Sequence, residues 1–278
     1  SSVKIYDVEY GWNRDHEDID ISVPLLIAHG TPINPFCEDD PACNNHGTAV
    51  LGEIIGSNNG NGILGIAYDA DIGLCPDYTA EFGSVRGDAI MQAVNDGTPG
   101  DIILLEMQAF ACNGLYGPAE WDQLVFDTTL VATFLGFVVV AAAGNGNLSL
   151  DDESCFNKFD LSVRDSGAII VGAGAPPYYP GFLPRERLEY SSYGTRVDAQ
   201  GWGRLVTTVG YGDLFYDPYS PYNQDRWYTK YFSGTSSASP FVAGAAAVIQ
   251  SYTKESYGSY LSSFAIRQVS STNIAFVH

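Results

Sequence analysis

The sequence predicts an α/β fold in which a doubly wound, mostly parallel sheet is flanked by helices on both faces. Two observations predict it: strand-like and helix-like segments alternate along the chain, and several of the strand segments are apolar without interruption. Continuous apolar runs are typical of parallel strands buried on both faces. In such a fold the functional site lies beyond the carboxyl ends of the strands.

The first half of the chain supplies most of this alternation. Apolar residues at helical spacing predict helices, and short runs that are apolar throughout predict buried strands. We expect strands at 3–7, 63–75 and 102–107, and helices at 46–55, 87–95 and 119–135.

The second half contains two more apolar runs, at 137–143 and 168–173, that we expect to be central strands. A helix of small residues is expected at 234–249, where Ala and Gly allow close packing inside the fold. Segments 175–186 and 210–231 are rich in Pro, Tyr, Asp and Asn and are predicted to be surface loops.

Composition indicates one globular domain spanning 1–278, since 45% of residues are hydrophobic and no Pro/Ser-rich linker divides the chain. With 13 basic and 33 acidic residues the net charge is −20, which argues against nucleic acid and anionic membranes as partners. It mildly favours cationic ligands, Ca²⁺ or a salty medium. The longest apolar run, 131–143, is shorter than the roughly 20 residues of a spanning helix.

The N-terminal residues 1–7 show no basic-then-apolar signal segment, so a targeting or pro-segment either has been removed or was never included. Five cysteines leave one unpaired. Cys37 and Cys43 bracket a short acidic loop, and Cys112 and Cys155 each follow a strongly apolar strand. We expect these two disulfides, a free buried Cys75 and an oxidising compartment; the alternative is five reduced thiols.

Three polar residues stand at the ends of predicted elements. Ser236 lies at the start of a predicted helix, where its N–H is near the positive end of the helix dipole and can stabilise an oxyanion. His46, one of four histidines, also opens a helix and is followed by Gly47. Asp7 ends the first predicted strand, where a buried carboxylate would orient the imidazole and stabilise its charged form. A nucleophile, a base and an orienting acid are therefore present.

In their order and local sequence these segments resemble the subtilase family of serine peptidases, whose triad runs Asp, His, Ser along the chain. Further matching segments are 62–67, 138–145 and 190–194. The resemblance implies a secreted serine endopeptidase with Asp7, His46 and Ser236 as its triad, acting on polypeptides through an acyl-enzyme. It also implies that Asn145 donates its side-chain amide to the oxyanion, opposite the N–H of Ser236.

The resemblance further implies a monomer without an organic cofactor, with an inhibitory pro-segment that is cleaved off. It places the substrate-binding strand at Glu106, Met107 and Gln108, with Gly144 beside Asn145. Glu106 stands where the family usually has a small hydroxyl residue. It could pair with a basic substrate side chain, raise the pKa of His46, or be hydrogen-bonded in a polar core; we adopt the second as the hypothesis.

The chain departs from the family pattern in several places. The aspartate segment reads Asp-Val-Glu-Tyr at 7–10 where a small residue and then glycine are usual. Val8 stands where convertases that process dibasic sites have an acid, and Ser237 replaces a common methionine. Both ends look trimmed relative to the family.

The resemblance also implies a structural calcium site. Asp18 matches a side-chain ligand, Asn59 would give its side-chain oxygen, and Ser57, Asn61 and Ile63 would give backbone carbonyls. Such an all-oxygen set suits Ca²⁺. The alternative is a Gly/Asn turn that binds no metal.

Three other classes of protein share part of this pattern. An α/β-hydrolase esterase needs Gly-x-Ser-x-Gly and the order Ser, Asp, His, whereas Ser236 is followed by Ser and Ala. Sedolisins share a Gly-Thr-Ser segment but replace the histidine by Glu and the oxyanion Asn by Asp. A catalytically silent subtilase fold that binds peptides would have no activated serine. The sequence favours the peptidase.

Overall fold

The computed structural model describes residues 3–19, 21–37 and 42–272. Its strands are β1 (Lys4–Glu9), β2 (Asp71–Pro76), β3 (Tyr78–Thr79), β4 (Gly83–Ser84), β5 (Ile102–Leu105), β6 (Gln108–Phe110), β7 (Tyr116–Pro118), β8 (Val138–Ala142), β9 (Ile169–Gly174), β10 (Ala199–Trp202), β11 (Val206–Val209) and β12 (Tyr228–Phe232). Its α-helices are α1 (Asn45–Ile55), α2 (Arg86–Asp96), α3 (Gln123–Phe134), α4 (Thr235–Tyr257) and α5 (Ser263–Thr272).

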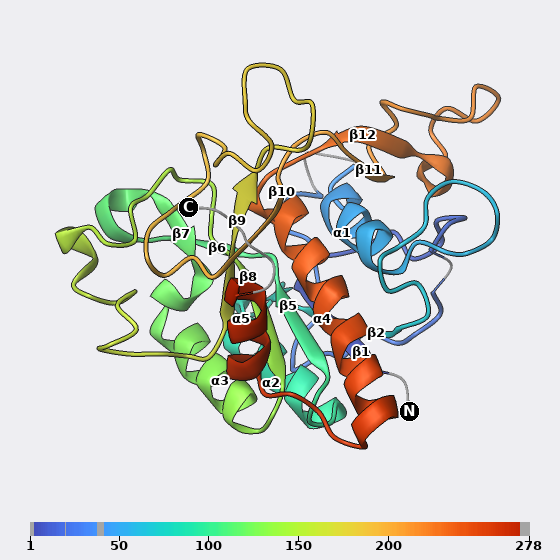
Figure 1. The fold of residues 1–278 in the computed structure, drawn as a ribbon. Helices are drawn as coiled ribbons and strands as arrows, with labels where there is room; N and C mark the ends of the chain where they lie inside the picture. Colours follow the sequence, from blue (N-terminus) through green and yellow to red (C-terminus); the bar gives the residue numbers. More distant parts are fainter. Residues whose placement is uncertain (1–2, 20, 38–41, 273–278) are drawn as a thin grey trace.

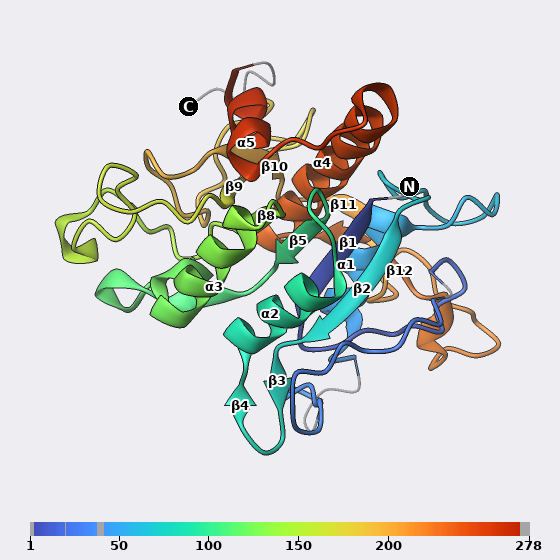
Figure 2. The same ribbon diagram turned by 90° about the horizontal axis from the view of Figure 1, so that it is seen from below.

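A six-stranded sheet in the order β10-β9-β8-β5-β1-β2 forms the centre of the molecule, and all its pairs are parallel. The strand order reverses between β1 and β5, so the crevice beyond these two strands is the topological switch point where ligands bind. Helices cover both faces, with α4 in front of the sheet in Figure 1 and with α2 and α3 on the opposite side from α4 in Figure 2. The predicted fold class is confirmed.

Side chains of β1 alternate between two apolar cores, as the pleat of a strand requires. Tyr6 and Val8 belong to the core that includes α2 and α3, and Ile5 belongs to the core that includes α1 and α4. By the same alternation Asp7 and Glu9 face α1 and α4, and both are buried. The strand therefore carries two carboxylates toward the helix that bears His46.

Several predicted elements differ from the structure at their bounds. The first strand continues two residues past the predicted end, to Glu9. The strand predicted at 63–75 is confined to β2, and the loop predicted at 210–231 includes the start of β12. Helix α3 begins at Gln123 because the Asp122 side chain accepts the N–H of Leu124 (2.9 Å) and caps it there. Strands β10 and β11 were not predicted, since their apolar residues are few and spaced by Gly and Thr.

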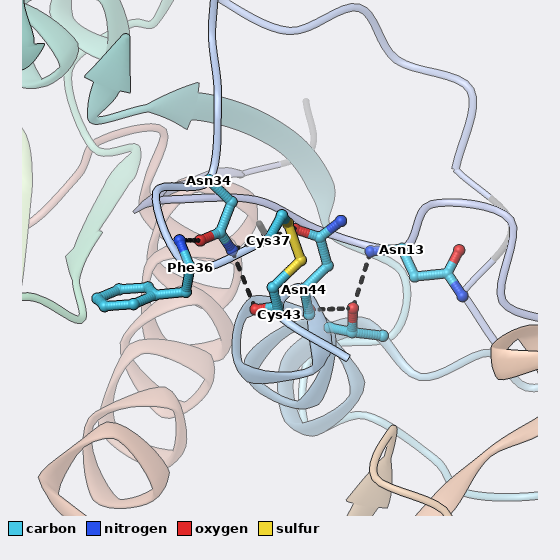
Figure 3. The surroundings of a disulfide bond; sticks show 7 residues. Asn13, Asn34, Phe36, Cys37, Cys43 and Asn44 are labelled. Carbon is cyan, nitrogen blue, oxygen red and sulfur yellow. Dashed lines mark hydrogen bonds between the residues drawn. A yellow bond between two sulfur atoms is a disulfide. The ribbon is translucent and has the colours of Figure 1, made fainter. Parts of the chain in front are cut away.

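The predicted cysteine pairing is confirmed. Disulfides join Cys37 to Cys43 (Figure 3) and Cys112 to Cys155, and Cys75 is buried with a free thiol. In the described part of the chain no helix is both long and apolar enough to span a bilayer.

Candidate active site

One groove of about 1080 Å³ contains the side chains that the sequence analysis singled out as nucleophile, base and amide donor. Its lining includes His46, Asn145 and Ser236 together with Glu9. Ser236 lies in the first turn of α4, and His46 is the second residue of α1. Segments far apart in the sequence therefore meet at the carboxyl-terminal edge of the sheet, next to the switch point.

The carboxylate on the histidine belongs to Glu9. Its Oε2 lies 2.5 Å from His46 Nδ1, and its Oε1 accepts the backbone N–H of Tyr10 at 2.7 Å. Both oxygens are therefore fixed, and the imidazole is held with Nε2 available to the groove. The His46 side chain is 39% exposed, whereas that of Glu9 is 7% exposed.

The longer Glu side chain fits because Gly47 has no Cβ. A Cβ at this position would lie 2.8 Å from Glu9 Cγ and 2.5 Å from the carbonyl oxygen of Gly11, which is closer than atoms can approach. The helix start can therefore lie against the end of β1 only with glycine there. Gly47 thus makes room for the extra methylene that a glutamate has over an aspartate.

Asp7 does not make the contact expected of it, and the structure corrects that assignment. Its Oδ2 accepts the indole N–H of Trp12 at 2.7 Å, and its Oδ1 is buried without a hydrogen-bond partner. The assignment failed because the strand was expected to end at Asp7, whereas it ends two residues later, at Glu9. The signal that could have found Glu9 is its place on the same strand face as Asp7, directly before the chain turns toward Tyr10 and Gly11.

Charge at the site changes the pKa of His46. Burial acts to lower this pKa, but the Glu9 carboxylate, with a smaller contribution from Asp7, outweighs burial and raises it above the ordinary value. Glu106 is not the cause, contrary to our hypothesis. It is 4% exposed, and its Oε1 accepts the hydroxyl of Ser239 at 2.8 Å, which is the polar-core alternative.

Asn145 and Ser236 present two N–H donors to the same place. Thr235 donates its backbone N–H (2.9 Å) and its hydroxyl (3.0 Å) to Asn145 Oδ1, which leaves the Asn145 amide nitrogen for the groove. A Cβ on Gly234 would lie 3.3 Å from Asn145 Nδ2 and 3.6 Å from the Ser236 nitrogen. Gly234 itself has φ +103°, a conformation that favours glycine. Two donors therefore flank one small space beside the Ser236 hydroxyl, which suits a developing oxyanion.

All three residues of the expected substrate strand line the groove, but Gly144 does not. Met107, Gln108 and Glu106 line it, and Gln108 Oε1 accepts the Asn145 backbone N–H at 2.9 Å. Gly144 instead packs against the backbone of Gly117, and a Cβ on Gly144 would lie 2.8 Å from the Gly117 Cα.

The residues expected to bind calcium come together but do not fit the ion. Asp18 Oδ2 accepts the backbone N–H of Ile63 at 2.7 Å, and Asp18 Oδ1 accepts the amide of Asn59 at 3.0 Å. Asn59 turns its own Oδ1 to the N–H of Asn61 (2.8 Å), and Ser57 donates its N–H to the Asp18 carbonyl (2.8 Å). A calcium site needs oxygens directed at a common centre. Here N–H groups are directed at the carboxylate, so the loop is closed by hydrogen bonds.

Comparison with known proteins relates most of the chain to one family. A family model described as the subtilase family matches residues 25–274, a range that includes His46, Asn145 and Ser236 and begins after Glu9. The chain is 27% identical over 220 residues to the major intracellular serine protease of Bacillus subtilis, covering 79% of this chain and 59% of that protein. It is 28% identical over 251 residues to subtilisin DY of Bacillus licheniformis, covering 90% of this chain and 77% of that protein.

A solved structure of the self-cleaved protease domain of PatA has a TM-score of 0.65 to this chain at 18% identity. The match covers 96% of this chain and 86% of that one. At this identity the likeness supports the fold alone.

Four buried carboxyls around the site make stability depend on pH. Burial and the charge of Glu9 raise the pKa of Asp7 to about 8 and that of Asp77 to about 7, and burial raises those of Glu53 and Glu106 well above the usual range. Between about pH 4 and these values the native protein holds protons that the unfolded chain releases. Stability therefore falls as pH rises through this window, because ionising each of these carboxyls costs more in the buried native site than in the unfolded chain.

We accordingly expect the melting temperature to fall steadily from pH 5 to pH 8. The change Asp7→Asn, which keeps an acceptor for the Trp12 indole, should make the fall less steep. Scanning calorimetry of both proteins in matched buffers measures this. A melting temperature that rises over this range, or an equal slope in the variant, would contradict the assignment.

Proposed function

Because this chain belongs to the subtilase family, we propose that it is a serine endopeptidase that hydrolyses peptide bonds through an acyl-enzyme on Ser236. The observation that carries the proposal is the 2.5 Å contact between Glu9 and His46, in a groove that also holds Ser236 and Asn145. The chain spans 59% of the length of the Bacillus subtilis relative, and the proposal concerns this chain alone.

In the proposed reaction Glu9, His46 and Ser236 form the triad. His46 Nε2 takes the hydroxyl proton as Ser236 Oγ attacks the scissile carbonyl, and Glu9 stabilises the imidazolium that forms. The amide of Asn145 and the N–H of Ser236 stabilise the oxyanion. His46 then gives its proton to the leaving amine, and a water molecule, activated in the same way, releases the acyl group.

We propose that the chain forms one catalytic domain, acts on polypeptides as a monomer, and matures by loss of an inhibitory pro-segment. The single central sheet with two apolar cores supports the first statement. We also propose that the protein is secreted. The two disulfides support this, because disulfides persist in oxidising compartments. The self-cleaved state of the PatA domain is a precedent for processing within the fold.

The triad is tested by comparing three variants. Ser236→Ala should abolish turnover of a fluorogenic peptide, because the nucleophile is gone. Glu9→Gln should lower kcat by on the order of 10³ to 10⁴-fold, since the charge that stabilises the imidazolium is lost. Asp7→Asn should stay within about tenfold of the parent. Circular dichroism verifies folding of each variant. The assignment fails if Asp7→Asn proves the more damaging of the two carboxylate changes.

The raised pKa of His46 sets the pH dependence of turnover. Only the neutral imidazole accepts the Ser236 proton, so kcat/KM should rise with pH through a midpoint above the ordinary value of about 6.5. Glu106→Gln should leave that midpoint unchanged, because Glu106 bonds to Ser239. A midpoint below 6, or one that moves in Glu106→Gln, would be evidence against this electrostatic account.

For the loop at 57–63 we propose that Asp18 does the work that calcium does elsewhere in the family. Asp18→Ala should lower the free energy of unfolding by roughly 3 kcal/mol, because it removes two hydrogen bonds to a buried charged acceptor. The parent protein should melt at the same temperature in EDTA and in millimolar calcium chloride. If calcium raises the melting temperature by several degrees, the loop binds the ion after all.

A further inference from the structure

Glu106 is a buried carboxyl that lines the proposed catalytic groove and that the proposed reaction does not use. It directly follows β5, next to the switch point of the sheet. Its Oε1 lies 2.8 Å from the hydroxyl of Ser239, which is three residues after Ser236 on α4. Its Oε2 has no hydrogen-bond partner among the described residues. This carboxyl is therefore connected by one hydrogen bond to the helix that carries the nucleophile.

The Ser239 hydroxyl has one proton but two neighbouring oxygens. Its Oγ lies 2.7 Å from the Thr235 carbonyl oxygen and 2.8 Å from Glu106 Oε1. A hydroxyl donates one hydrogen bond and can accept two, whereas an ionised carboxylate can only accept. With Glu106 ionised, Ser239 can donate to only one of its two neighbours. With Glu106 protonated, both contacts are hydrogen bonds, because the carboxyl donates to Ser239 Oγ and Ser239 donates to the Thr235 carbonyl.

The surroundings of Glu106 favour the protonated form. Burial is the main cause that raises its pKa well above the usual range, and it outweighs the opposing effect of the Ser239 contact. Charged groups face Glu106 from β1 and α1, and these groups, Asp7, Glu9 and Glu53, are carboxyls that raise the pKa further. Ionisation would also place charge on a buried Oε2 that no described group donates to, which is costly.

Thr235 links this chain of hydrogen bonds to the oxyanion site. Its N–H (2.9 Å) and its hydroxyl (3.0 Å) both donate to Asn145 Oδ1, and its Oγ1 accepts the Gly144 N–H at 3.2 Å. The residue that orients the Asn145 amide is therefore the same residue whose carbonyl ends the chain from Glu106. Hydrogen bonds in a buried chain strengthen one another. Loss of the Glu106 proton would draw the Ser239 hydroxyl away from Thr235 and loosen the support of Asn145.

Resting on the peptidase function proposed above, we propose that Glu106 is a positioning residue that works as a neutral acid. Its proton orders Ser239 and Thr235, and Thr235 in turn holds Asn145 in place for the oxyanion. Glu106 acts through these residues and not on the substrate. Deprotonation of Glu106 therefore sets an alkaline limit to turnover, separate from the limit that His46 sets on the acid side.

The experiment measures kcat and KM on a blocked fluorogenic peptide without ionisable side chains, from about pH 6 to about pH 11. In the parent, kcat should fall on the alkaline side while KM changes little, because the oxyanion contact is made in the transition state. Glu106→Gln has an amide N–H that can donate to Ser239 at every pH. It should keep kcat within about threefold of the parent maximum and remove the alkaline fall.

Two variants with cut or retained hydrogen bonds complete the comparison. Glu106→Ala and Ser239→Ala each break the chain, so each should lower kcat by on the order of tenfold with little change in KM and without an alkaline fall. Glu53→Gln is the matched control, because it removes a neighbouring buried carboxyl of α1 and leaves the contact between Glu106 and Ser239 in place. It should keep the alkaline fall.

Infrared difference spectra of the parent and Glu106→Gln at neutral pH give a readout that needs no turnover. They should contain the C=O band of a protonated carboxylic acid. Circular dichroism at each pH limits the comparison to folded protein, and if Glu106→Ala fails to fold, Glu106→Gln and Ser239→Ala carry the test.

The inference is overturned if Glu106→Gln keeps the alkaline fall, if kcat of the folded parent does not fall, or if the infrared difference shows a carboxylate at neutral pH. Absence of cleavage by the folded parent at every pH would instead refute the peptidase function itself. The infrared band would then still decide whether Glu106 holds its proton.

Discussion

The hydrogen bond between Glu9 and His46 is the contact on which the site depends, and the fold is arranged to permit it. The strand β1 places Glu9 at its carboxyl end, α1 carries His46 in its first turn, and the missing side chain of Gly47 lets the two approach. The backbone N–H of Tyr10 fixes the second oxygen of Glu9, so the carboxylate cannot rotate away from the imidazole. Thr235, the first residue of α4, holds Asn145 next to Ser236 through its backbone N–H.

This arrangement imposes opposite demands on pH. A carboxylate against His46 favours the imidazolium, so the neutral base needed for proton transfer forms at higher pH. Burial raises the pKa values of Asp7 and Asp77, so the folded protein is most stable when these carboxyls are protonated, which requires lower pH. Buried acids therefore limit the working pH range at both ends. Glu9 sets the lower limit through the pKa of His46, and Asp7 and Asp77 set the upper limit through stability.

The sequence predicted five of the six strands of the central sheet and the helices that carry His46 and Ser236, because each lies in a strongly patterned segment. It mistook Asp7 for the acid because strand ends are uncertain by a few residues, and a shift of two keeps the same strand face. Strands β10 and β11 were missed because their pairing depends on partners far along the chain. The contacts of Asp18 and Glu106 could not be predicted, since each partner lies in another element.

The length of one side chain also bears on how such proteins are classified. A search that demands aspartate at the end of the first strand would either accept Asp7 for the wrong reason or, in a relative lacking it, discard the chain as an inactive pseudoenzyme. The same carboxylate position can be reached from Glu9 because the space next to Gly47 holds one more methylene. A glutamate at this strand end is therefore compatible with the contact to the histidine as long as the residue opposite it is glycine.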